Sequence, residues 1–149
     1  MSSLLEIFNS SKSRVPRKYL HELDHWLRPQ LFKLVHGRRE LIRRKLVVVF
    51  VGQRQGRKIN LQFRGRNYAT DVLSFEPVEP DGLGELIFCH DVIKNQAIAH
   101  GLSFQSELAY MHIHGVLHLL GYDHEKSQSS ARRMFKIQDE LFERWLERV

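Results

Sequence analysis

Apolar and polar positions alternate with two periods along this chain, the period of a strand in some segments and the period of a helix in others. The alternating stretch Leu4–Phe8 predicts a short strand. Pro16, a residue suited to the first turn of a helix, then opens a helical pattern that Pro29 kinks or restarts. The β-branched run Leu46–Val51 predicts a buried strand, with Gly52–Gly56 as the exit from it. The apolar side of the first helix is formed by Leu20, Leu23, Leu27, Leu31 and Leu34.

The middle of the chain predicts a hairpin between helices. Val72–Phe75 and Leu83–Cys89 have strand character, and they flank Pro80-Asp81-Gly82, which is a strong turn sequence. We therefore expect these two strands to pair. Short helices are expected at Ile59–Phe63 and Asp91–His100.

The next helix is apolar on nearly every side. Ser103 is suited to cap its start, and Gly121 to stop it. Because a helix of this kind must be buried, we expect it at the centre of the fold. A last helix begins near Ser129, and its core stripe is Met134, Ile137, Leu141, Trp145 and Val149. Together the elements predict an α+β fold over residues 1–149, a single domain with a small mixed sheet, about five helices and a cleft beside the central helix.

Size and composition narrow the class of protein. With 149 residues, 42% of them hydrophobic, the chain is long enough for one domain with a real core. Cys89 is the only cysteine, so no internal disulfide is possible, and the chain fits a reducing cytoplasm. The longest apolar run, Leu46–Val51, is far too short to span a bilayer, so we expect no membrane segment.

The formal charge of +6 predicts an acidic partner, although charge alone does not choose RNA. Two basic clusters stand out. For the first, within Arg38–Lys45, a solvated surface and a nucleic-acid contact are equally good interpretations. The second contains no acidic residue, and we expect it to touch nucleic acid; its members are Arg54, Arg57, Lys58, Arg64 and Arg66.

The strongest chemical signal is the segment between His114 and His124. His114 and His118 are four residues apart, so they share one face of a helix. Gly121 ends that helix and reverses the chain, which brings His124 back toward the same point. Three imidazoles with a fourth position left for water form a catalytic zinc site. Two histidines at this spacing are often only solvated residues, but the third histidine and the apolar helix favour one bound Zn²⁺ ion.

The residue after the first histidine separates this site from that of a peptidase. In the H-E-x-x-H motif a glutamate follows the first histidine and acts as general base. Gly115 stands at that position here. The sequence therefore predicts the metal site of a hydrolase without the peptidase base.

Two motifs carry a resemblance to a known family. The segment H-G-V-L-H-L-L-G-Y-D-H from His114 to His124, together with Thr70–Phe75 (T-D-V-L-S-F) and the preceding Phe63-Arg64-Gly65, resembles the YbeY family of bacterial zinc-dependent endoribonucleases. The resemblance covers most of the chain from about Lys45 onward. Glu85 and His90 depart from the family's usual aspartate and proline, which leaves details of the cleft wall open.

The resemblance implies hydrolysis of phosphodiester bonds in single-stranded RNA. It also implies a role in maturation of ribosomal RNA, at the 3′ end of the small-subunit RNA, and in ribosome quality control, with the ribosome or its associated proteins as partners. The chain carries no signal for an oligomeric state. A zinc peptidase, disfavoured by Gly115, and a non-catalytic ribosome-associated protein with structural zinc remain alternatives.

Individual residues receive roles on this interpretation. Arg64 is expected to be catalytic, because a guanidinium fork matches phosphate and can hold the charge of the transition state. Ser74 is expected to contact RNA. Asp123 either orients a ligand imidazole or caps the turn. His112 lies about 200° round the helix from His114, so we expect a structural or surface role and no metal contact.

Overall fold

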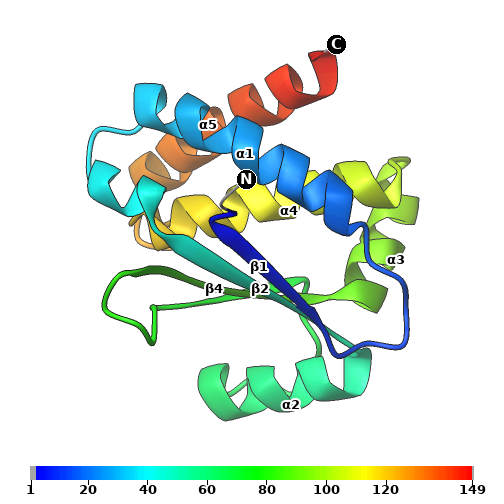
Figure 1. The fold of residues 1–149 in the computed structure, drawn as a ribbon. Helices are drawn as coiled ribbons and strands as arrows, with labels where there is room; N and C mark the ends of the chain where they lie inside the picture. The colour runs from blue at the N-terminus through cyan, green and yellow to red at the C-terminus, as the bar shows by residue number, and fades with distance from the viewer. Residues whose placement is uncertain (1–2, 149) are drawn as a thin grey trace.

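The computed structural model describes residues 3–148 and contains a four-stranded sheet with helices on both faces (Figure 1). The strand order is β1-β2-β4-β3. The strands are β1 (Leu5–Asn9), β2 (Lys45–Val51), β3 (Val72–Phe75) and β4 (Gly82–Cys89). The helices are α1 (Arg17–Leu34), the 3-10 turn η1 (Arg39–Arg43), α2 (Gln53–Arg64), α3 (His90–His100), α4 (Phe104–Leu119) and α5 (Gln128–Glu147). The α+β class and the mixed sheet are confirmed.

The sheet is parallel over three strands and antiparallel at one edge. β1 pairs with β2, and β2 with β4, in parallel, whereas β3 pairs with β4 in the predicted antiparallel hairpin. Helix α2 covers one face, and α1, α4 and α5 lie over the other (Figure 1). Because both faces are covered, the central strand β2 can be almost continuously apolar, as the run Leu46–Val51 is.

Helix α4 lies inside the molecule, as its all-round apolar pattern predicts. It contacts α1, α3 and α5 as well as strands β3 and β4. Ser103 caps its start, since the Ser103 hydroxyl accepts a hydrogen bond from the Ser106 N–H at 3.0 Å. The regular helix ends at Leu119, and Gly121 follows with φ +99°, in the left-handed region that reverses the chain.

Helix α2 is longer than expected. It spans Gln53–Arg64, so the predictions of an exit segment at Gly52–Gly56 and of a helix confined to Ile59–Phe63 are wrong. Its first turns are rich in exposed polar residues, which masks the helical period. Gly56 is buried and faces the sheet, where a Cβ would be in ordinary contact with Cys89 and Val51 at 3.5 Å.

The remaining boundaries agree closely with the expected elements. Helix α1 continues through Pro29 without interruption. Helix α5 begins one residue before the expected Ser129, and Met134, Leu141 and Trp145 of its stripe are buried in the core. Val149, the last position of that stripe, lies outside the described residues. No helix within residues 3–148 is long and apolar enough to cross a membrane.

Candidate metal centre and RNA cleft

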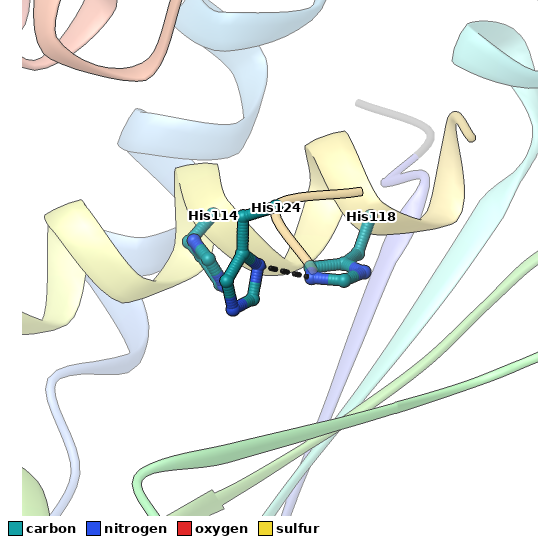
Figure 2. Close-up of side chains that lie close together, drawn as sticks. All are labelled: His114, His118 and His124. Carbon is teal, nitrogen blue, oxygen red and sulfur yellow. Dashed lines mark hydrogen bonds between the residues drawn. The ribbon is translucent and has the colours of Figure 1, made fainter. Parts of the chain in front are cut away.

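Helix α4 and the loop that follows it bring three histidine side chains together. His114 and His118 come from adjacent turns of the helix, and His124 returns from the loop (Figure 2). One nitrogen from each ring lies within 4.8 Å of the other two. The ring centroids are 5.0–5.2 Å apart. The three histidines that the sequence spacing predicted to converge could therefore hold one metal ion.

Backbone hydrogen bonds shape the loop that returns His124. After Gly121 reverses the chain, the Tyr122 N–H donates to the Leu117 carbonyl at 3.0 Å and closes the end of the helix. Asp123 caps the next turn, because its Oδ1 accepts from the Glu125 N–H at 2.7 Å. This hydrogen bond lowers the pKa of the Asp123 carboxyl. Of the two roles open to Asp123, turn capping is the one that the hydrogen bonds of the described residues support.

The protonation of the rings suits a metal ligand. Burial lowers the pKa of both His114 and His118, and the neighbouring imidazoles lower it further. The lowered pKa favours the neutral ring, which is the form that binds a metal. His118 Nε2 lies 3.1 Å from His124 Nδ1, a hydrogen bond in which one nitrogen carries a proton (Figure 2). A cation among the rings would replace that proton.

Gln138 of α5 orients the first ring, and the sequence analysis missed it. Its Oε1 lies 2.9 Å from His114 Nδ1, and since an amide oxygen only accepts, His114 Nδ1 must carry the proton. The lone pair is then on Nε2 and available to a metal. A polar residue placed between Met134 and Leu141 on the buried stripe was the signal that could have found Gln138.

His112 points the other way, as predicted, and has a structural role. It is fully buried, and its Nε2 lies 3.2 Å from Oδ1 of Asp24. Asp24 also accepts from Arg28 at 2.8 Å, and Arg28 donates to the carbonyls of Leu4, Ile42 and Arg44. Burial alone would raise the pKa of Asp24, but the hydrogen bond and charge of His112, with those of Arg28, hold it below its ordinary value.

The histidines open into a cavity of about 550 Å³, the metal-site cavity. Edge strand β3 and the residues before it, from Thr70 to Ser74, form one wall. Arg64, Arg66 and Ser74 all line it. The predicted catalytic residue and two predicted RNA contacts therefore lie beside the histidines.

Gly115 stands at the point where α4 touches the sheet. A Cβ at this residue would lie 2.7 Å from Leu86 Cδ2, so α4 approaches β4 more closely than any side chain here would permit. The position that carries the glutamate of H-E-x-x-H therefore has no room for one.

The far end of the cavity contains an acidic group that the sequence analysis did not assign. Glu107, two helical turns before His114, is only 2% exposed and lies 2.7 Å from His100 Nδ1. Glu107 could have been found by its spacing, since seven residues bring a side chain back to the same face of a helix.

Tyr110 of α4 lines the same cavity. It donates a hydrogen bond to Asp139 at 2.9 Å, and burial together with that hydrogen bond raises the pKa of Tyr110 to about 12.

Arg64 is held at the rim of the metal-site cavity. It is the last residue of α2, and its Nη2 donates to the Ser74 carbonyl at 2.9 Å. Its Cζ lies 5.0 Å above the ring of Phe75. Its Nη1 also donates to the Phe63 carbonyl at 3.3 Å, so the guanidinium is fixed at the cavity and its remaining N–H groups are left for a ligand.

Three members of the second basic cluster lie elsewhere. Arg54 and Lys58 line a separate hollow with the loop Ser10–Ser13, and Arg57 is exposed on the same helix. Arg54 is about 15 Å from Arg64 along the helix axis, at 1.5 Å per residue. The structure thus does not bring these three side chains to the metal-site cavity. In the first cluster, Arg39 and Arg43 lie over the ring of Phe32.

Comparison with known proteins gives a consistent result over nearly the whole chain. The profile of the family described as Endoribonuclease YbeY matches residues 6–146. An endoribonuclease YbeY of Bdellovibrio bacteriovorus is 48% identical over 143 residues, which are 96% of this chain and 95% of that protein. One from Thermosipho melanesiensis is 32% identical over 139 residues, 93% of this chain and 94% of that protein.

A solution structure of a protein from Thermotoga maritima has a similar fold. The two share 30% sequence identity with a TM-score of 0.60, over 95% of this chain and 91% of that one. The family profile, the identity to full-length relatives and this likeness of fold all lead to one assignment: the chain belongs to the endoribonuclease YbeY family.

Proposed function

We propose that this protein is a zinc-dependent endoribonuclease that hydrolyses phosphodiester bonds of single-stranded RNA. His114, His118 and His124 would hold one Zn²⁺ ion, which would leave a position for water. The observation that carries the proposal is the convergence of three imidazoles in a cavity that Arg64 also lines.

The donor set fits zinc and an anionic substrate. Three neutral imidazoles leave the full charge of the ion uncompensated, and imidazole nitrogen is a preferred zinc ligand. When bound, the ion supplies a Lewis acid that polarises a phosphoryl oxygen and lowers the pKa of water. Gln138 holds the His114 ring in the tautomer that presents Nε2, and burial lowers the pKa of His114 and His118, which favours the neutral rings.

Arg64 is the residue we assign to the substrate phosphate. Its guanidinium is fixed by Ser74 and Phe75 at the rim that faces the histidines, so it needs little ordering when RNA binds. A planar donor fork suits two oxygens of one phosphate and becomes more favourable as negative charge builds up there. Arg66 and Ser74 line the same cavity and are proposed to contact the RNA beside it.

The family supplies the wider setting of this proposal. The relatives are named endoribonucleases, and the charge of +6 favours a polyanionic partner. We place the activity in the cytoplasm and in maturation of ribosomal RNA, with the ribosome as the site of action.

The test is metal analysis of the purified protein beside cleavage of a single-stranded RNA with and without chelator. We expect about one zinc per chain, and cleavage that chelator abolishes while the far-ultraviolet circular dichroism is unchanged. A protein that unfolds when chelated would instead have structural zinc. Cleavage that continues in excess chelator would overturn the proposal.

Replacement of Arg64 tests its role separately. Arg64→Ala should lower RNA cleavage roughly a hundredfold, by analogy with loss of one donor to developing charge, while zinc content and melting temperature stay close to the parental values. Arg64→Lys should restore only part of the rate, because an ammonium lacks the planar fork. An Arg64→Ala protein that cuts RNA at the parental rate would contradict the assignment.

A further inference from the structure

A second hollow lies next to the metal-site cavity, and the mechanism above does not use it. Its volume is about 730 Å³, and we call it the Phe63 hollow. Three residues line both spaces, namely Arg64, Ser74 and His118. The two spaces therefore meet at the metal ligand His118 and at the guanidinium assigned to the phosphate.

Phe63 supplies an aromatic surface in this hollow. It is 55% exposed, although its ring packs edge-to-face on Phe75 with the centroids 5.3 Å apart. Phe75 is itself half-buried and has the Arg64 guanidinium over its ring. Phe63 is thus the ring of this pair with surface left for a stacking partner, and its contact with Phe75 holds it in place.

The lining of the Phe63 hollow indicates the chemistry of its occupant. Apart from the three shared residues it is apolar or acidic, and its two carboxylates are Glu76 and Glu85. A phosphate would be repelled from such a space. A nucleobase is uncharged, has flat faces that stack on aromatic rings, and carries edge N–H groups that carboxylates accept.

From this juxtaposition we propose that the Phe63 hollow is a base-stacking subsite for a nucleotide that flanks the cut. The proposal rests on the proposed function, because it takes the scissile phosphate to lie between Arg64 and the histidines. A phosphate at that shared rim leaves the base of an adjoining nucleotide within reach of Phe63. Stacking of this kind accepts any base, so the subsite positions the strand without reading its sequence.

The test is a double-mutant cycle between Phe63 and the base. kcat/KM is measured for the zinc-loaded parent and Phe63→Ala, with intact RNA and with RNA that has an abasic residue at each position flanking the cut in turn. At the stacking position, the abasic residue should lower the parental kcat/KM roughly 5- to 150-fold, mainly through KM. Phe63→Ala should show a similar loss with intact RNA and little further loss with abasic RNA.

Two further variants make the test specific. Leu61→Ala, on the same helix and 48% exposed but outside the hollow, should cleave both substrates as the parent does. Phe63→Trp should retain the parental preference for intact RNA over abasic RNA. If the losses from Phe63→Ala and from the abasic residue simply multiply, or if Phe63→Ala cleaves intact RNA like the parent, the stacking subsite is wrong. If the unsubstituted, zinc-loaded protein cleaves no RNA, the proposed function itself is wrong.

Discussion

Replacing Gly115 with alanine should measure how tightly helix α4 packs on the sheet. The new Cβ would lie 2.7 and 2.9 Å from the two Cδ atoms of Leu86 and 3.3 Å from its Cγ. Ordinary carbon contacts lie at about 3.5–4.0 Å. Leu86 is fully buried in β4, and the short distance to Cγ means that turning its methyl groups alone does not relieve the overlap.

The expected cost follows from two opposing effects. Overpacking of a core costs about 1–3 kcal/mol, whereas alanine in place of glycine within a helix gains about 0.8–1 kcal/mol. Given the size of the overlap, we expect Gly115→Ala to lower the free energy of unfolding by about 1–2 kcal/mol. Urea denaturation in excess chelator measures this without a contribution from metal binding.

A control variant and a double-mutant cycle identify the cause of the lost stability. Gly37→Ala should change stability by less than about 0.5 kcal/mol, because nothing lies within 4 Å of the new Cβ. Leu86→Ala alone should cost about 2–5 kcal/mol, and the double variant should cost at least about 1 kcal/mol less than the sum. Strict additivity, or a Gly115→Ala protein as stable as the Gly37→Ala control, would refute the packing argument. Gly115→Glu should destabilise the fold further and create no peptidase.

Three other predictions concern the histidines and their partners. Gln138→Leu should weaken zinc binding roughly 10- to 100-fold in competition with a chromogenic chelator, because His114 loses the acceptor that fixes its tautomer. Its effect on stability should be small, since the hydrogen bond lost by His114 is offset by removal of the buried Gln138 Nε2, which has no partner among the described residues. Unchanged zinc affinity would contradict the orienting role. His112→Ala should retain zinc but lose about 1–3 kcal/mol of stability, because it takes one partner from the buried carboxylate of Asp24; loss of zinc in this variant would mean that His112 faces the metal. Burial lowers the pKa of His114 and His118 below 6.5, so just below that pH the unfolded chain binds more protons than the folded chain. The stability of the metal-free protein should therefore rise with pH up to about 6.5, and it should be lost as the pH falls through the lowered pKa values. Zinc affinity should follow the same direction, and a steep decline already above pH 6.5 would be inconsistent with neutral rings.

The histidine cluster was predictable from the sequence because its geometry is local. Helical spacing places His114 beside His118, and a glycine stop is enough to return His124. Gln138 was not predictable in the same way, because its contact with His114 depends on how α5 packs across α4. The pairing of Arg64 with Ser74 likewise depends on the approach of α2 to the edge of the sheet.

Helix α2 shows where periodicity fails. Its exposed first turns carry Gln53, Arg54 and Gln55, and its inward residue is Gly56, so no apolar stripe indicated its start, although Gln and Arg are themselves good helix formers. The charged cluster on this helix was interpreted as one surface. The structure divides it instead, because a helix of this length separates its two ends.

The locality of the three histidines also affects what a metal measurement reports. All three lie between residues 114 and 124, so they can meet after closure of one short loop, whereas β1 and β2 pair residues as distant as Leu5 and Leu46. An unfolded chain that keeps some affinity for the ion reduces the stabilisation gained from binding. If the proposed zinc binds, zinc content is therefore a weak indicator of the native state, and hydrogen exchange at β1 and β2 would reveal misfolded material that a metal assay accepts.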